Sequence, residues 1–533
     1  MTDKQILPEM NQERSLSSLS KNICHYLSGL FPVTCSSDEF WFFPQVIHEY
    51  TSLNAWDHFS NETVSECCKK LSSWHTDIQK MMNINHPSTP TEIDAFLLSN
   101  MIQTLQEHLE HFRPWERQPT FHLSIACIGL AQALTYGRKS DLTQRISKLP
   151  DFLKRASMVI HNVPELFMAS GLKMVNDTRI FFQDCLHIVP DIKKSINALN
   201  DFHDTLIQMK TINSFLLPVE DYAHLVKSHM QTQLDLKTIE EILEQEIQFN
   251  KEKIQKFNTT DFLVAQKHLI KPEKNSPLQW FSNEVQRLKA HCIKHHLITE
   301  QLKNDCSVQI EPVPDFLKTI RTASSYSFSP FQKSCHGTFY VLSDETQQKG
   351  SQYLSEESPM LTAHETYPGH HLLDASRSML NRKIRRPLES PLFYEGWACF
   401  GEILMLETQF YQSDHASVLI NKRRLWRAIR GKIDLFVHSG KMSFDEAADL
   451  LCDAGIDFNR ASQIVRQYPL HPGYQLSYSI GLQQFQRLYS QKKLSMDQWV
   501  QTVLSEGEIP FDLLENILMG HGSDRSNLSD LTD

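Results

Sequence analysis

Apolar residues recur at helical spacing along most of the chain. One segment shows the pattern clearly, with apolar residues at steps of three, four, four and seven and charges on the opposite face: Leu236, Ile239, Leu243, Ile247 and Ile254. The stretch 121–137 is apolar on nearly every side, yet too short and too polar to cross a bilayer, and it predicts a buried helix. A breaker at 83–90 precedes another predicted helix beginning near Thr91. We therefore expect a mainly α-helical protein.

The pattern changes once, between residues 311 and 344. Several prolines are followed by the run 338–342, which is rich in β-forming residues and bounded by Gly337 and Ser343. This run predicts a short strand, after which helical patterns resume. The expected architecture is a large helical body with one small β element, placed just before the segment that carries the chemistry.

Polarity and length suggest how the 533 residues divide. Residues 1–20 are polar and are expected to be disordered, and 521–533 form an expected flexible tail. We expect a helical N-terminal region at 21–215, either a lid or part of the same body. A helical catalytic region is expected at 216–520.

Composition narrows the classes of function. Hydrophobic residues make up 41% and charged residues 22%, which suits an ordered globular protein. The net charge of -10, without a basic stripe, argues against nucleic acid as a partner. The 11 cysteines are odd in number and contain no CxxC pair, which favours free thiols in a reducing compartment. With no apolar leader and no membrane span in the sequence, we expect a cytoplasmic protein whose oligomeric state is left open.

One short segment holds three histidines and a glutamate. His364 is followed at once by Glu365, as in the HExxH motif of zinc peptidases, where two histidines at i and i+4 share one helix face. Here position i+4 is Pro368, and the next histidines are His370 and His371, at i+6 and i+7. The standard motif is therefore absent.

A break in the helix would restore the geometry. On a straight helix His370 would lie about 9 Å along the axis from His364 and on the opposite side. Pro368 clashes with the carbonyl four residues earlier, and Gly369 accepts unusual backbone angles. A break there could turn His370 back toward His364. The alternative is a surface helix that ends at Pro-Gly with incidental histidines.

The segment 391–407 adds two carboxylates to an apolar helix. Glu395 and Glu402 are seven residues apart and share one face. A carboxylate in apolar surroundings is costly unless it is paired or binds a metal. Two histidines and a glutamate with one open position form a known catalytic zinc site. Alternatively, both glutamates pair with arginines such as Arg382 or Arg385.

A third segment, 426–478, concentrates polar residues at helical spacing. Their steps are three, four and four in one helix, with a tyrosine further on: Arg427, Arg430, Asp434, His438 and Tyr478. The pattern is typical either of a buried, ion-paired helix face or of donors that bind substrate and an oxyanion. Tyr478 could equally be a core tyrosine.

Together these segments resemble the bacterial "domain of unknown function 885" family, thought to be zinc metallopeptidases related to the gluzincins. The family pattern HExxPGHHxQ, EGWAxYxE, RxxxDxxxH and PGxxxSYxxG is matched, in order, by 364–373, 395–402, 430–438 and 472–481. The resemblance is clear over about 218–489. The chain departs from it at Leu373 and Tyr474, where the family often has glutamine, which affects substrate contacts rather than the metal core.

The resemblance implies a zinc hydrolase that cleaves short peptides. Its first PGHH histidine is the ligand, so the implied zinc ligands are His364, His370 and Glu395. Glu365 would be the base that takes a proton from the zinc-bound water. Tyr478, or else His438, would bind the oxyanion.

Substrate would be bound by three further residues: Tyr340, Arg430 and His371. The backbone of the predicted strand could pair with an extended peptide. Three alternatives remain: a zinc hydrolase of a non-peptide amide or ester, an inactive binding protein of the same fold, and a metal-free helical scaffold. The ligand assignment predicts that donor atoms of the two histidines and Glu395 lie within about 4–5 Å of one another, because Zn–N and Zn–O bonds are about 2.0–2.2 Å.

Overall fold

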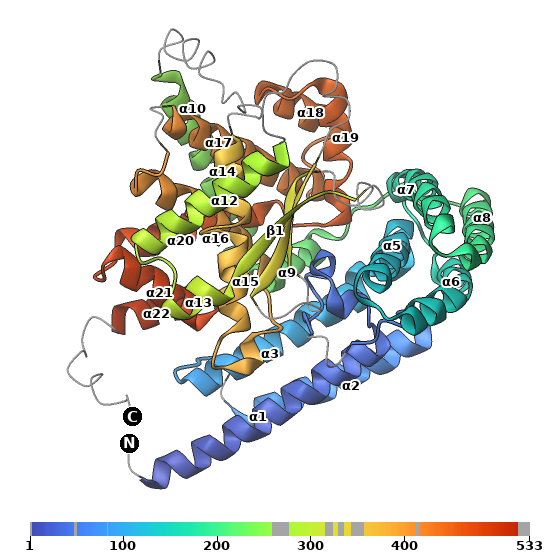
Figure 1. The fold of residues 1–533 in the computed structure, drawn as a ribbon, viewed down its shortest axis with the longest axis horizontal. Coiled ribbons are helices and arrows are strands. Elements are labelled where there is room, and N and C mark those ends of the chain that lie inside the picture. Colours follow the sequence, from blue (N-terminus) through green and yellow to red (C-terminus); the bar gives the residue numbers. More distant parts are fainter. Residues whose placement is uncertain are drawn as a thin grey trace.

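The computed structural model confirms a mainly α-helical protein with one small sheet (Figure 1). The structure describes residues 3–46, 51–82, 84–257, 277–314, 323–328, 335–342, 357–411 and 415–520. The expected flexible tail, 521–533, lies outside these residues.

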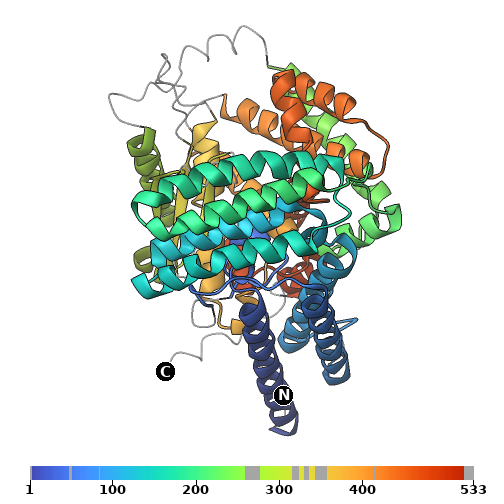
Figure 2. The ribbon, with the colours of Figure 1, turned by 90° about the vertical axis from the view of Figure 1, so that its right-hand side faces the viewer.

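The N-terminal half is a set of long helices. Their bounds are α1 Asp3–Leu30, α2 Asn61–Met81, α3 Pro90–Glu107, α5 Pro119–Tyr136, α6 Lys139–Val159, α7 Glu165–Asp184 and α8 Lys193–Gln208. Helices α5 to α8 pack as a bundle in which α5 and α8 each contact both α6 and α7 (Figures 1 and 2). The helix predicted near Thr91 is α3, and the buried helix predicted at 121–137 is α5.

Helix α1 covers most of the range 1–20 that polarity led us to expect as disordered. Leu16, Ile23 and Leu27 of this helix are buried in the core. Their spacing of seven and four places them on one helix face, so a sparse apolar stripe holds a helix that is polar elsewhere. The average polarity of the segment concealed that stripe.

The C-terminal half is built around packed pairs of helices. Its first helices are α9 Val219–Met230, α10 Leu236–Gln255, α12 Pro277–Lys294, α13 Glu300–Asp305, α14 Ser358–Glu365, α15 His370–Ser378 and α16 Pro391–Glu407. They are followed by α17 Ala416–His438, α18 Phe444–Asp453, α19 Phe458–Val465, α20 Leu476–Ser490, α21 Met496–Glu506 and α22 Phe511–Gly520. Helix α10 is the amphipathic helix predicted from the sequence, and it packs on α17.

The sheet has three strands in the order β1-β3-β2. They are β1 Ser307–Pro312, β2 Ser325–Phe328 and β3 His336–Val341; β1 is parallel to β3, and β2 is antiparallel to it. The predicted strand is β3, but it is central: Tyr340 pairs with Glu311 on one side and Ser325 on the other. The hypothesis that this strand pairs with a peptide is therefore wrong, since both of its edges are occupied. A substrate role for the Tyr340 side chain stays a prediction.

One apolar core joins the two halves. Its buried side chains come from both sides of residue 215, for example Leu27 and Phe167 before it and Ile239 and Phe485 after it. The region 21–215 therefore shares its core with the remainder of the chain. The division into regions at 215 stays a prediction.

Helices α16 and α20 cross at two glycines. A Cβ added to Gly481 would lie 2.1 Å from the Leu392 carbonyl oxygen and 2.7 Å from Gly396 Cα. The backbones touch because neither glycine carries a side chain there. This contact sets α20 close against the helix that carries Glu395.

We predict that Gly481→Ala destabilises the protein by about 1–3 kcal/mol, because the added methyl group forces the two backbones apart. Gly29→Ala in α1 is the control, since nothing lies within 4 Å of its added Cβ; it should be neutral or stabilising by up to about 1 kcal/mol. Urea unfolding of both variants is the measurement. Equal free energies of unfolding would show that the crossing is not tight.

Candidate metal centre

The helix that begins with the zinc-peptidase signature breaks where the sequence predicted. Helix α14 ends at Glu365 and α15 begins at His370, and the Gly369 N–H donates to the Ala363 carbonyl at 3.0 Å across the break. A Cβ on Gly369 would lie 1.8 Å from the His364 carbonyl oxygen. Glycine is required by this close approach and not by its φ of -76°.

A hydrogen bond from helix α16 holds the break between α14 and α15 in place. The Trp397 indole N–H donates to the Pro368 carbonyl oxygen at 2.8 Å, and the Trp397 side chain is fully buried. Glu395 lies two residues before this tryptophan. The bond that holds the turn therefore also sets the distance between the turn and Glu395.

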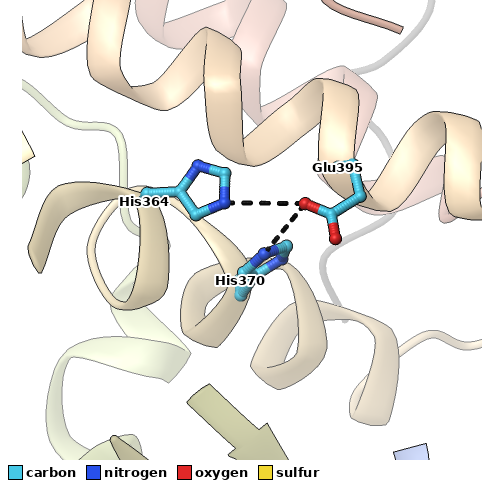
Figure 3. Close-up of side chains that lie close together, drawn as sticks. All are labelled: His364, His370 and Glu395. Atoms are coloured by element: carbon cyan, nitrogen blue, oxygen red, sulfur yellow. Dashed lines mark ion pairs between the residues drawn. The ribbon is translucent and has the colours of Figure 1, made fainter. Parts of the chain in front are cut away.

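His364, His370 and Glu395 converge on one buried point (Figure 3). His364 Nε2 and His370 Nε2 each lie 3.5 Å from Glu395 Oε2, and one ligand atom from each of the three residues lies within 4.8 Å of the others. The predicted convergence is confirmed. The group could hold a metal ion.

The spacing of these atoms suits a shared ion. Bonds of about 2.0–2.2 Å in tetrahedral geometry separate ligand atoms by about 3.3–3.6 Å. Glu395 Oε2 is buried and accepts no hydrogen bond in the described part of the chain. Burial opposes its charge, but the two imidazoles outweigh burial and hold the pKa of the Glu395 carboxyl well below its ordinary value. A buried carboxylate oxygen without a donor fits a site completed by a cation.

Glu402 orients the first histidine. Its Oε1 lies 3.1 Å from His364 Nδ1 and 2.6 Å from Arg427 Nη2, and Arg423 holds both of its oxygens at 2.9 and 3.0 Å. Although burial raises the pKa of Glu402, the two arginines hold it well below its ordinary value. An N–H on Nδ1 facing this carboxylate leaves the Nε2 lone pair for a metal.

The arginines proposed from the sequence as partners of the glutamates are the wrong ones. Arg382 and Arg385 each bind Asp94 at 2.6 Å instead. Glu402 is paired by Arg423 and Arg427 of α17, because the fold lays α17 beside α16. The distance along the sequence between Glu402 and these arginines did not predict that α17 lies beside α16.

A stacked tyrosine holds the second histidine. The ring of His370 lies 4.1 Å from that of Tyr394, nearly parallel at 20°. The Tyr394 hydroxyl donates to Asp374 Oδ2 at 3.2 Å, and Asp374 is paired with Arg377 at 2.5 Å. Tyr394 precedes Glu395 directly and was missed by the sequence analysis.

His371 is directed away from the metal group. Its Nε2 lies 3.1 Å from both the Tyr367 hydroxyl and Cys306 Sγ, and its Nδ1 lies 3.3 Å from the Tyr326 hydroxyl. It is fully buried, and burial lowers its pKa to about 3. The preference for His370 over His371 as the convergent histidine is therefore confirmed. The structure does not bring His371 to the group, and its proposed contact with substrate stays a prediction.

Glu365 lies beside the sheet. Its Oε2 accepts the backbone N–H of Tyr326 in β2 at 2.7 Å, and its side chain is buried. It is not among the three convergent residues. One oxygen is thus anchored while the residue stays next to His364 in the chain.

The α16–α20 crossing brings two tyrosines to Glu395. The Tyr474 hydroxyl donates to Glu395 Oε1 at 2.7 Å. Burial raises the pKa of Tyr478 well above its ordinary value, and the adjacent Glu395 charge raises it further. Tyr478 thus lies next to Glu395, and its expected oxyanion role stays a prediction. Tyr474 entered the sequence analysis only as a departure from the family pattern.

His438 lies elsewhere. Its ring stacks on Tyr222 at 4.9 Å, is edge-on to Phe215 at 6.0 Å and lies 3.6 Å from Asp434. Burial lowers its pKa to about 3, so the ring is neutral. None of the three convergent residues is among these neighbours.

Asp434 positions the loop that leads into α20. Its two oxygens accept the backbone N–H groups of Gly473 and Gln475, each at 3.0 Å, and the Tyr222 hydroxyl at 3.3 Å. Arg430, one turn earlier, donates to the Gln475 side chain. This part of the 430–438 motif therefore holds the chain that presents the tyrosines.

We predict that Glu402→Gln weakens zinc binding by about 10–100-fold, because His364 loses the charged acceptor that orients it. The matched control is Glu246→Gln, since Glu246 pairs with Arg424 of the same helix α17 at 2.7 Å, and it should bind zinc normally. Competition with a chromogenic chelator measures both affinities. Unchanged affinity in Glu402→Gln would exclude the orienting role.

Solved structures share this fold. A "putative lipoprotein of unknown function" from Shewanella oneidensis is 14% identical with a TM-score of 0.68, over 95% of this chain and 99% of that chain. A "putative lipoprotein" from Colwellia psychrerythraea is also 14% identical, with a TM-score of 0.74, over 96% and 99%. At this identity the likeness shows the fold alone. None of the curated proteins compared with the sequence matches it.

These neighbours contradict the expected cytoplasmic location, since both are described as lipoproteins. The expectation relied in part on unpaired cysteines, and ten of the 11 are buried by the fold. Packing protects such thiols in any compartment, so they do not report redox conditions. Within the described ranges, no helix has the length and hydropathy that a bilayer span requires.

The family model described as "Bacterial protein of unknown function (DUF885)" matches residues 46–518. The match includes all four motifs and nearly every helix described above. The chain therefore belongs to the DUF885 family of bacterial proteins of unknown function.

Proposed function

We propose that this protein is a zinc-dependent hydrolase, a gluzincin-like metallopeptidase that cleaves short peptides. The observation that carries the proposal is the buried group of His364, His370 and Glu395, in which Glu395 Oε2 lies 3.5 Å from both imidazoles and accepts no hydrogen bond from the described residues. Buried polar atoms in native proteins have partners, and two imidazoles with one carboxylate are the partners that zinc prefers.

Three protein donors would leave a fourth position of the ion open. A zinc ion held by these three residues would polarise the scissile carbonyl as a Lewis acid and would lower the pKa of a bound water molecule. The chain itself supplies the orientation, since Glu402 fixes the ring of His364 and Tyr394 fixes that of His370. The surrounding burial keeps bulk water from the ligands.

Glu365 is the proposed base. It would accept the proton of the attacking water on a carboxylate oxygen and deliver it to the leaving amine nitrogen. The Tyr326 N–H that holds Oε2 limits rotation of the carboxylate and leaves Oε1 for the proton. Glu365 is not one of the three convergent residues, which agrees with a role as general base and not as a metal ligand.

Tyr478 is the proposed oxyanion donor. Its hydroxyl lies against Glu395, and a half-buried phenol whose pKa is raised keeps its proton. A neutral, rigid donor suits the charge that develops on a scissile carbonyl oxygen. Tyr474, which already donates to Glu395, is better placed to hold that ligand.

A peptide could lie along β2. In the described part of the sheet this strand pairs only with β3, and its Tyr326 N–H points to Glu365. An extended segment along this side would pass next to the proposed base. The same centre would also serve a non-peptide amide or ester, and a panel of peptides, amides and esters separates these substrates.

Two neighbouring substitutions should differ in their effect on zinc. His364→Ala removes a ligand and should abolish both zinc binding and hydrolysis. Glu365→Gln should keep zinc and lose about 10²–10⁴-fold in kcat, because only the proton acceptor is removed. Metal content and kcat of both variants are the measurements. Equal zinc loss in the two would refute the division of roles, and a wild-type protein that purifies without zinc affinity would favour an inactive binding protein or a scaffold.

Substitutions of the two tyrosines should also differ in their effects on zinc binding and on kcat. Tyr478→Phe should lower kcat by about 10²–10³-fold at unchanged zinc affinity, the usual cost of one oxyanion donor. Tyr474→Phe removes the bond to Glu395 and should weaken zinc binding more than it lowers kcat of the zinc-loaded protein. Chelator competition and steady-state kinetics measure the two effects. An unaltered kcat in Tyr478→Phe would show that the Tyr478 hydroxyl does not bind the oxyanion and that the residue is structural.

A further inference from the structure

Helix α17 carries four arginines near its middle, and one of them lacks a carboxylate. Arg423 and Arg427 pair with Glu402, and Arg424 pairs with Glu246. In the residues that the structure describes, Arg430 forms no ion pair with a carboxylate; it donates to the Gln475 amide oxygen, it lies beside the Tyr468 hydroxyl, and its buried Nε has no partner. A guanidinium stays charged in a protein, so a half-buried one without a paired carboxylate needs an explanation.

Aromatic residues enclose this guanidinium. Its Cζ lies 4.3 Å from the ring centre of Trp426, 4.8 Å from that of Tyr478 and 5.9 Å from that of Tyr468. The Trp426 indole nitrogen is also buried without a hydrogen-bond partner in the described part of the chain, and the buried Tyr468 hydroxyl has Arg430 as its neighbour. Guanidinium and indole N–H groups only donate. The Arg430 guanidinium, the Trp426 indole N–H and the Tyr468 hydroxyl thus gather at one place, and no carboxylate among the described residues accepts from them.

The carboxylates near Arg430 already have other partners. Asp434 lies one helical turn after Arg430, but its oxygens accept the N–H groups of Gly473 and Gln475 and the Tyr222 hydroxyl. Glu395, whose charge also acts on Arg430, lies against the two histidines. The donors around Arg430 therefore fit an acceptor that arrives from outside the chain.

We propose that Arg430, Trp426 and Tyr468 bind the terminal carboxylate of a peptide substrate. The inference rests on the proposed hydrolase function, which it narrows to removal of residues from the carboxyl end. Arg430 faces the ring of Tyr478, whose hydroxyl lies against Glu395. Since an extended residue spans about 3.3–3.6 Å, one phenol ring between the carboxylate and the metal group leaves room for one or two residues.

Binding can be tested apart from turnover. The probe is a ketomethylene dipeptide analogue, which cannot be hydrolysed, prepared as the free acid and as the carboxamide. Calorimetry on the zinc-loaded full chain should show the free acid binding about 10–100-fold more tightly, as expected for hydrogen bonds to a charged group. Arg430→Gln should abolish that preference, and Arg430→Lys should keep a part of it because it retains the charge but not the planar fork.

Arg424→Gln is the matched control, since it removes one charge from the same helix at a residue already paired with Glu246; it should keep the full preference. Equal binding of acid and amide by the wild type would overturn the proposal, as would a folded Arg430→Gln that keeps the preference. Should Arg430→Gln fail to fold, the wild-type comparison and Arg430→Lys decide the outcome.

A third analogue separates the two sources of carboxylate. It carries a carboxamide end and a glutamate side chain. If it binds as tightly as the free acid, the site recognises acidic side chains and the proposal fails. If the wild type prefers the free acid through Arg430 yet hydrolyses no peptide, the carboxylate site stands and the proposed hydrolase function fails. If it hydrolyses acid and amide peptides equally well, the hydrolase stands and the carboxylate site fails.

Discussion

The close approach of backbone at the break between α14 and α15 is the constraint on which the centre depends. Gly369 lies against the carbonyl of His364, and the Pro368 carbonyl is held by Trp397. The two extra residues between the histidines are thereby absorbed in a turn, and both imidazoles reach one point. Because Trp397 and Glu395 share α16, the same hydrogen bond sets the position of the third ligand. Bulk at Gly369 or loss of the indole would disturb all three together.

The remainder of the site depends on how closely other helices approach α16. Gly396 and Gly481 allow the backbones of α16 and α20 to touch. This contact brings Tyr478 of α20 next to Glu395 of α16. On the other side α17 supplies two arginines to Glu402. Asp434 then ties α17 to the loop that precedes α20. Each contact is a buried, charged or close-packed one, so the site is a product of the core and not of a surface loop.

The sequence predicted what is local and missed what depends on helix crossings. The break at Pro368, the amphipathic helix α10 and the strand β3 all follow from neighbouring residues. The convergent ligands could be predicted because two of them flank that break. The partners of Glu402, the role of Tyr394 and the place of His438 could not, since periodicity gives the face of a helix but not what covers it. Likewise, β-propensity identified β3 but could not show that it is central.

The charges of the interior show how the centre and the arginine site are related. Glu402 is a buried anion balanced by two arginines, and Asp434 is satisfied by backbone donors. Near the centre, Glu395 Oε2 accepts no hydrogen bond and Arg430 has no paired carboxylate among the described residues. Both are neighbours of Tyr478, one suited to a cation and the other to an anion. Unpaired buried charge is costly, so a chain that keeps both gains stability when both are filled. A metal ion at one and a substrate carboxylate at the other would complete the same balance that the rest of the core already shows.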